Sequence, residues 1–159
     1  MSFLDWLGVT VAAKSPEVGD AAPEIVSRDE LGREVSLADL YREGIVLVYF
    51  YPKADTPGCT VEACSLRDDF AALTDRGVRI VGVSADGPVA QMRFKEKHQL
   101  PFTLLADHDR IVARAFGVRL ILGMPHRQSF LIKGGRVVWR DLHASTGDQA
   151  RDVLKALES

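Results

Sequence analysis

The 159-residue chain has only two cysteines, no run of basic residues and no long apolar run. Two cysteines are too few for the disulfide framework of a small secreted protein, which favours a reactive pair in a reducing cytoplasm. The 20 basic and 22 acidic residues leave no charge excess that would attract nucleic acid or an anionic membrane. No apolar stretch is long enough for a membrane-spanning helix. We therefore expect a small or neutral substrate.

The histidines do not complete a metal site with the cysteines. Zinc ligands usually come as C-x₂₋₄-C with a second pair of ligands, and no such pair is formed by His98, His108, His126 or His143. The run Asp107-His108-Asp109 directly precedes a predicted helix, where capping explains it better than a metal cluster or a catalytic histidine does.

Both cysteines follow a predicted buried strand. Residues 45–50 are apolar and rich in β-branched and aromatic residues, and Pro52 ends the run. A helix start is then predicted, with Thr56 as the N-cap and Pro57 at the first helical position. Cys59 therefore falls in the first turn, among unsatisfied backbone N–H groups at the positive end of the helix dipole. A thiolate is favoured there.

Cys64 lies five residues further along the same predicted helix. Five residues are about 140° around the axis and about 7.5 Å along it, which separates the two Cα atoms by roughly 8.6 Å. A disulfide needs less than about 7 Å, so a bond between Cys59 and Cys64 requires the first turns to unwind. Cys64 shares its face with Arg67 and Asp68, where solvent or another protein can reach it. The spacing alone leaves open that both cysteines are small core residues.

The rest of the chain alternates between strand and helix signals. Hairpins are predicted over residues 24–36 and 128–139, further buried strands over 78–84 and 102–106, and helices over 88–98, 110–116 and 147–157. In the helix over 88–98, the inner side is expected to carry Val89, Met92 and Phe94. The order implies an α/β fold with a mixed central β-sheet, helices on both faces and an N-terminal β-hairpin.

The N-terminal stretch 1–17 is expected to form an extension of a single domain that covers positions 18–159. Residues 3–13 are apolar enough to suggest a signal peptide, but a basic start is missing and Asp5 interrupts the run. Ser2 as a cap and Gly8 as a stop favour a short amphipathic helix that docks on the domain or stays mobile. Export is the alternative.

The cysteine segment is similar to a known active-site signature. Its sequence, P-K-A-D-T-P-G-C-T-V-E-A-C, resembles the P-x₃-T-x₂-C signature of the peroxiredoxins, in the form of the bacterioferritin-comigratory or Q-type subfamily. The likeness extends from Val18 through V-G-V-S-A-D, L-P-F-T-L-L-A-D and H-R-Q-S-F-L-I to the C-terminal helix. The resemblance implies a thioredoxin-like fold.

The resemblance also implies a reaction. The Cys59 thiolate would attack the O–O bond of hydrogen peroxide or an organic hydroperoxide and become a sulfenic acid. Arg127, from H-R-Q-S-F, would stabilise the thiolate and donate to a peroxide oxygen, the alternative being a surface arginine. Cys64 would resolve the sulfenic acid as an intramolecular disulfide, which thioredoxin or glutaredoxin would reduce. No metal, haem or flavin cofactor is required, and a monomer is expected, with a dimer as the alternative.

Three supporting residues follow from the same resemblance. Thr56 would accept a backbone hydrogen bond as the N-cap and also bind the sulfur or the peroxide through its hydroxyl. Pro52 would shield the sulfur from water and fix the loop, or simply end the strand. Glu62 matches a position that orients an arginine, although a solvated helical glutamate fits the pattern almost as well.

Two other classes of function are weaker. A protein disulfide reductase or redox-sensing adaptor of the thioredoxin type would need C-x-x-C with a cis-proline opposite, whereas this chain has C-x₄-C and only Pro125 near such a position. A non-catalytic binding module would leave the signature without a purpose.

Overall fold

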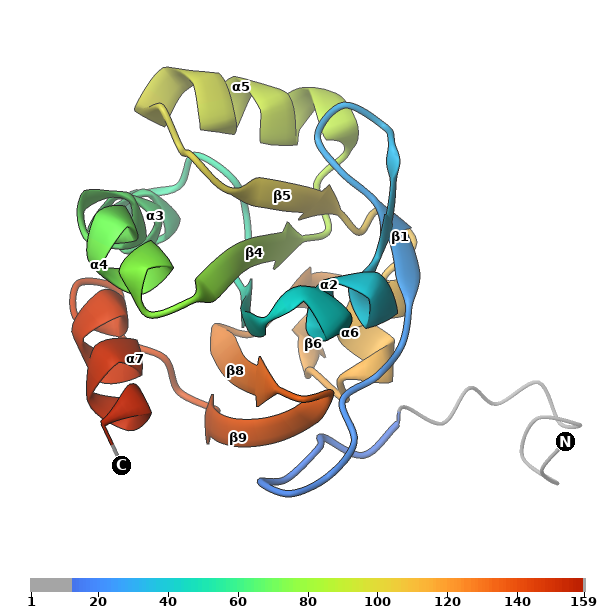
Figure 1. Ribbon diagram of the computed structural model, residues 1–159. Helices are drawn as coiled ribbons and strands as arrows, with labels where there is room; N and C mark the ends of the chain where they lie inside the picture. The colour runs from blue at the N-terminus through green and yellow to red at the C-terminus, as the bar shows by residue number, and fades with distance from the viewer. Residues whose placement is uncertain (1–12, 159) are drawn as a thin grey trace, which may run out of the picture.

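A computed structural model describes residues 13–158 of the chain (Figure 1). The short helix expected near the N-terminus lies outside these residues. The extension and the domain boundary after residue 17 therefore stay predictions.

Strands and helices alternate along most of the described chain. Their bounds are β1 (Val26–Arg28), β2 (Glu34–Ser36), α2 (Leu37–Glu43), β3 (Ile45–Phe50), α3 (Pro57–Asp68), α4 (Phe70–Asp75), β4 (Val78–Ser84), α5 (Pro88–His98), β5 (Thr103–Ala106), α6 (Ile111–Ala115), β6 (Leu120–Ile121), β7 (Met124–Pro125), β8 (Gln128–Lys133), β9 (Arg136–Asp141) and α7 (Gln149–Leu157). The predicted hairpins β1–β2 and β8–β9 are confirmed, as is the order of buried strands and helices between them. The small hairpin β6–β7 was not predicted.

The central sheet is mixed, as the sequence predicted. Its five strands lie in the order β5-β4-β3-β8-β9, with β3 parallel to β4 and antiparallel to β8. Tyr49, near the end of β3, lies between Gly82 of β4 and Ser129 of β8. This register places the end of β3, where the cysteine segment begins, in the middle of the sheet.

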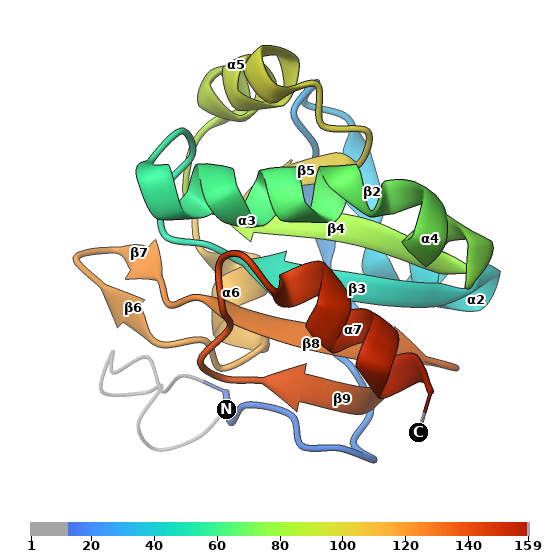
Figure 2. The same ribbon diagram turned by 90° about the vertical axis from the view of Figure 1, so that its left-hand side faces the viewer.

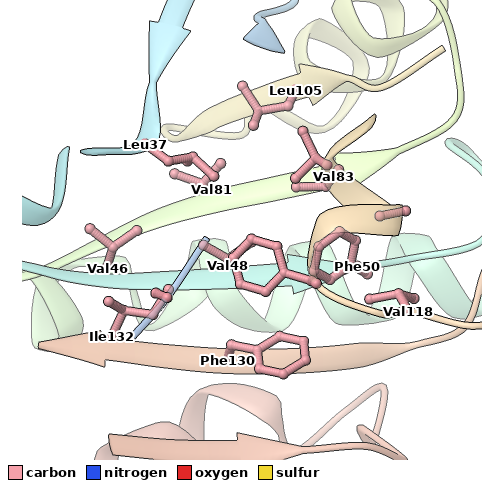
Figure 3. Close-up of a cluster of buried hydrophobic side chains, with 14 of the residues drawn as sticks. Leu37, Val46, Val48, Phe50, Val81, Val83, Leu105, Val118, Phe130 and Ile132 are labelled. Carbon is pink, nitrogen blue, oxygen red and sulfur yellow. The ribbon is translucent and has the colours of Figure 1, made fainter. Parts of the chain in front are cut away.

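Helices cover both faces of the sheet, and each face has its own apolar core. On one face, α2 and α6 pack on β3, β4 and β8 through residues such as Leu37, Phe50 and Phe130 (Figure 3). On the other face, α3, α4, α5 and α7 contribute to a second cluster that contains Cys59. Figure 2 shows α3 and α4 end to end in front of the sheet, with α7 beside them. The architecture is a thioredoxin-like α/β fold, as the resemblance implied.

The cysteine helix ends earlier than its apolar stripe suggests. Ala63, Leu66 and Leu73 are fully buried along the predicted stripe, but Asp69 ends α3 and Phe70 begins the separate helix α4. The Asp69 N–H bonds back to the Ser65 carbonyl at 3.2 Å, which closes the last turn of α3. The break follows Cys64, so both cysteines stay on one continuous helix.

The predicted inner face of α5 is confirmed for Phe94 and wrong for Val89. In α5, Val89 is 65% exposed, whereas Gln91 and Phe94 are buried. The Gln91 side chain accepts a hydrogen bond from the Tyr51 hydroxyl at 2.5 Å and donates to the Leu105 carbonyl at 2.8 Å. A polar residue occupies the inner face because partners from β5 and from the segment after β3 satisfy both ends of its amide.

Candidate active site

Cys59 lies in the first turn of α3, at the end of the sheet where β3 finishes. Thr56 is the N-cap residue with extended backbone, Pro57 follows at the start of the helix, and the Thr60 N–H makes a 2.8 Å bond to the Thr56 carbonyl. The Cys59 side chain is 2% exposed. Its sulfur therefore lies near the unpaired N–H groups of a helix start and is shielded from bulk water, which strengthens electrostatic interactions with it.

Arg127, which is distant from Cys59 in the sequence, contacts this sulfur. It directly precedes β8, and its Nη2 atom lies 3.4 Å from Cys59 Sγ, in hydrogen-bonding geometry. The backbone of Arg127 is held as well, since its carbonyl accepts from the Ala144 N–H at 3.1 Å. A cation 68 residues away in sequence thus faces the sulfur from a fixed position.

Glu62 holds the other branch of the same guanidinium. Arg127 Nη1 donates to Glu62 Oε1 at 2.6 Å, and the glutamate side chain is fully buried. Burial raises the pKa of Glu62 to about 8, and the charge of Arg127 opposes that rise. For Arg127 itself, burial would lower the pKa, but Glu62 and Cys59 together hold it above the ordinary value. A solvated helical glutamate, the alternative left open by the sequence, is wrong.

Gly58 belongs to the site and was missed by the sequence reasoning. A Cβ atom at this position would lie 3.2 Å from Arg127 Nη2 and 3.6 Å from the Thr146 methyl group. A side chain here would push the guanidinium away from the sulfur. The signal was present in the T-P-G-C order, because glycine is common where another group approaches the backbone closely.

Thr56 does not make the cap bond that was predicted. Its hydroxyl donates to the Lys53 carbonyl at 2.7 Å, and its side chain accepts no backbone N–H of α3. The hydroxyl stabilises the loop before the helix, which leaves the first N–H groups of α3 unoccupied by this side chain. Pro52 lies half-buried in the same loop.

Cys64 is half-buried and, like Cys59, a free thiol. The helix between the two is unbroken, with Glu62 and Ala63 both fully buried. The neighbouring Ser65 hydroxyl donates to the Gly147 carbonyl at 3.0 Å, and Arg67 Nη1 donates to the His98 carbonyl at 2.8 Å. These contacts hold α3 in its helical form against α5 and the segment before α7.

Tyr49 contributes a buried phenol beneath the site, which the sequence reasoning did not single out. Its hydroxyl is buried without a hydrogen-bond partner, and the second oxygen of Glu62 is buried in the same condition. Burial raises the pKa of Tyr49 well above its ordinary value, and Tyr51, Glu62 and Cys59 raise it further. The phenol therefore stays neutral.

The aspartate run before α6 is a capping device, as predicted. Asp107 accepts the Val112 N–H on one oxygen at 3.0 Å and the Ala113 N–H on the other at 2.9 Å. Over residues 13–158, no group of three or more His, Cys, Asp and Glu side chains is arranged to hold a metal ion. Within the same residues, no helix has the length and apolar character to cross a membrane.

Sequence comparisons identify the proteins that this chain is similar to. Residues 18–140 match the AhpC/TSA family. Peroxiredoxin Bcp of Escherichia coli is 47% identical over 123 residues, covering 73% of this chain and 78% of the relative. Peroxiredoxin Bcp of Bacillus subtilis is 37% identical over 153 residues, covering 89% and 95%.

Solved structures give the same answer for the fold. The peroxidoxin BcpB of Mycobacterium tuberculosis superposes with a TM-score of 0.84 at 34% identity, covering 90% of this chain and 97% of that chain. The bacterioferritin comigratory protein of Xanthomonas campestris, described for its alkyl peroxide reduction activity, has a TM-score of 0.79 at 27% identity, covering 87% and 98%.

Proposed function

The chain belongs to the AhpC/TSA family and is a peroxiredoxin, and we propose that Cys59 is the residue with which it reduces peroxides. The observation that carries the proposal is the contact between Arg127 Nη2 and Cys59 Sγ. A buried sulfur at a helix start that also faces a guanidinium is stabilised as a thiolate, which is the nucleophilic form. An inert core cysteine would not be expected to face a guanidinium group.

The first step is a displacement at oxygen. The Cys59 thiolate attacks one peroxide oxygen, an S–O bond forms and the O–O bond breaks. The leaving oxygen departs with the bonding electrons and takes up a proton, giving water or an alcohol, while Cys59 becomes a sulfenic acid. The guanidinium of Arg127 has N–H donors for the thiolate sulfur and for the leaving oxygen. It can therefore stabilise the negative charge as this moves from the sulfur to the oxygen. We assign Glu62 to hold that fork and Pro52 to shield the sulfur.

The second step joins the two cysteines. The Cys64 sulfur attacks the Cys59 sulfenic acid, an S–S bond forms, and the hydroxyl leaves as water. The continuous helix separates the sulfurs too far for this bond, so the start of α3 must unwind first. A dithiol protein such as thioredoxin or glutaredoxin then reduces the disulfide by exchange.

The substrate class is proposed from a structural neighbour, and the compartment from the cysteine content. Alkyl peroxide reduction is described for the Xanthomonas campestris neighbour, and we extend it to this chain together with hydrogen peroxide. Two cysteines in a chain of this size suit a reactive pair in a reducing cytoplasm. We expect no nucleic acid among its partners and a monomer as the working unit, with a dimer as the alternative.

Stopped-flow fluorescence tests the attacking role of Cys59. Trp139 packs against the apolar cluster that contains Cys59, so oxidation of the site should change tryptophan emission. Reduced protein mixed with hydrogen peroxide should oxidise rapidly, with one peroxide consumed per cysteine pair. The Cys59→Ser variant should show no reaction. If it keeps peroxidase activity, the assignment of the attacking cysteine is wrong.

The Cys64→Ser variant tests the resolving role. The attacking thiolate and its donors remain, so the first oxidation should proceed within about twofold of the parent rate and give a sulfenic acid that a dimedone-type probe labels. Turnover with thioredoxin should fall, and excess peroxide should add two oxygens to the protein mass. Failure of the first oxidation would instead place Cys64 in the attacking step.

A further inference from the structure

The hairpin β6–β7 presents apolar side chains to solvent. Leu122 at its tip is 92% exposed and Ile121 is 44% exposed. Figure 2 shows β6 and β7 projecting from the body of the molecule, at the end of the sheet where β3 finishes and α3 begins. We call residues 119–126 the apolar hairpin. Its last residue, His126, directly precedes Arg127, whose guanidinium contacts Cys59.

The backbone conformation of the hairpin turn is unfavourable for Leu122. Ile121 pairs with Met124, which leaves Leu122 and Gly123 as the two turn residues, with φ values of 54° and 76°. Two positive φ values define a mirror-image turn, for which Asn-Gly is the preferred sequence. A leucine in the left-handed region is strained. Because the Leu122 side chain is almost fully exposed, no burial of apolar surface offsets this strain.

Arginines flank the hairpin in the sequence. From residue 110 to residue 140 the chain has six arginines and one lysine but no aspartate or glutamate. Arg110 braces the turn, with its Nε donating to the Gly123 carbonyl at 3.1 Å. Arg119 is exposed and lies opposite His126 at the base, where the His126 N–H donates to the Arg119 carbonyl at 2.9 Å. Arg114 of α6 is also exposed, with Asp109 as the nearby acid in the chain.

We propose that the apolar hairpin docks on the headgroup region of an anionic bilayer, so that Cys59 meets hydroperoxides carried by lipids. An exposed apolar tip with arginines at its base is the combination that binds such an interface, because the tip enters the acyl boundary while the cations contact anionic headgroups. The near-neutral total charge predicted no membrane partner. The local field decides surface binding, however, since charges beyond about 8 Å are largely screened at physiological salt.

Vesicle binding tests the docking surface without reference to catalysis. Parent protein should co-sediment with vesicles made of phosphatidylcholine with a smaller share of phosphatidylglycerol, and should not sediment with phosphatidylcholine alone. Leu122→Asn should weaken binding about tenfold or more, while its melting temperature is equal to the parent's or higher. Val18→Asn is the matched control, because Val18 is 63% exposed in a turn elsewhere and should leave binding unchanged.

A second pair of variants tests the contribution of the arginines to vesicle binding. Arg119→Gln should weaken binding about fivefold, the effect expected for one cation at an anionic surface, whereas Arg151→Gln on the exposed side of α7 should not. Equal binding by parent and Leu122→Asn would overturn the proposal. So would a dimeric parent that becomes monomeric on Leu122→Asn, because the hairpin would then be an interface between two copies.

The delivery of substrate rests on the proposed peroxidase function and is measured separately. Rates are compared for phosphatidylcholine hydroperoxide in the anionic vesicles and for hydrogen peroxide in solution. The ratio of these two rates should fall about tenfold in Leu122→Asn and stay constant in Val18→Asn. A parent that reduces neither peroxide would overturn the peroxidase function and leave the sedimentation result to decide the docking surface. An unchanged ratio in Leu122→Asn, with binding lost, would overturn delivery.

Discussion

Arg127 divides its guanidinium between two partners. Nη2 faces Cys59 Sγ and Nη1 bonds to Glu62 Oε1, so one planar group links the sulfur to a buried carboxyl group. Gly58 permits this approach because it has no side chain where the guanidinium lies. A lysine could supply the charge but not two donors in fixed directions.

The Arg127→Lys variant tests this distinction. Its rate of reaction with peroxide should fall by about 10² to 10³, the usual effect of removing one donor to a developing charge. Stopped-flow traces measure the rate, and Arg136→Lys on the exposed end of β9 serves as the control. An Arg127→Lys protein that reacts within about threefold of the parent would show that the second donor is not used in the transition state.

Glu62 should make stability depend on pH. Burial raises its pKa from 4.5 to about 8, so between these values the folded protein holds a proton that the unfolded chain has lost. The stabilisation is therefore complete below pH 4.5 and is lost as the pH rises through about 8. From pH 5 to pH 8.5, the parent should lose more than about 1 kcal/mol of unfolding free energy relative to Glu62→Gln.

Urea unfolding at both pH values measures this difference. The exposed Glu96→Gln variant should follow the parent at each pH, because Glu96 on α5 is not buried. Parallel pH profiles for the parent and Glu62→Gln would mean that Arg127 keeps Glu62 ionised throughout, against the effect of burial.

At the scale of elements, α3 carries both cysteines and the site that they serve. Its first turn presents Cys59, its buried face presents Glu62, and Cys64 lies on its half-buried side. The helix is held by Arg67 against the end of α5 and by Ser65 against the segment before α7. Both contacts lie after Cys64, so the start of the helix can open while its second half stays docked.

Oxidation should therefore loosen one part of α3. Because a Cys59–Cys64 disulfide requires unwinding, backbone amides from Cys59 to Cys64 should lose protection from hydrogen exchange in the oxidised protein, by about tenfold or more. Amides of β3, which carries no cysteine, should keep their protection and are the internal control. Equal protection of the Cys59–Cys64 amides in both redox states would mean that Cys64 forms its disulfide with another thiol.

At the scale of the whole molecule, the N-terminal hairpin covers an edge of the sheet. Glu30, in the turn between β1 and β2, has a side chain only 4% exposed and pairs with Lys95 of α5. Its second oxygen accepts the Leu104 N–H of edge strand β5 at 3.3 Å, and Asp29 forms a bridge to Leu105. The hairpin thus uses backbone groups that an open edge strand would offer to other chains.

Removing the partner of Glu30 should be costly. Lys95→Met leaves a buried carboxylate unpaired and should lower the free energy of unfolding by about 2 to 4 kcal/mol. The double variant Glu30→Gln/Lys95→Met should recover part of the loss, because no charge then stays buried. Urea titrations give both values, with exposed Lys133→Met as the control. A loss below about 0.5 kcal/mol would make the pair equivalent to a surface ion pair.

Local signals in the sequence were sufficient for most of the elements, though not for the hairpin β6–β7, and for the place of Cys59. The apolar run of β3, the Thr56-Pro57 start of α3 and the Lys133-Gly134-Gly135 turn act over only a few residues, since they depend on backbone angles and neighbouring hydrogen bonds. The first-turn position of Cys59 and its distance from Cys64 follow from the same short-range geometry. The resemblance supplied Arg127 and its two expected partners, Cys59 and Glu62, but not the distances or the burial of the pair.

The tertiary structure alone decided which polar groups are buried. Helical periodicity gives the face of a helix on which Glu62 or Gln91 lies, but not which element covers that face. In α5 it predicted that Val89 is buried, whereas the buried residue is Gln91. An acidic side chain is buried where a partner satisfies it, and the partner of Glu62 is Arg127, 65 residues away in the sequence. The same holds for the Thr56 hydroxyl, which bonds to a loop carbonyl, and for Leu122, whose exposure depends on a hairpin that the sequence did not predict. Long-range partners decide these cases because the free energy of burying a polar group depends on its neighbours in space.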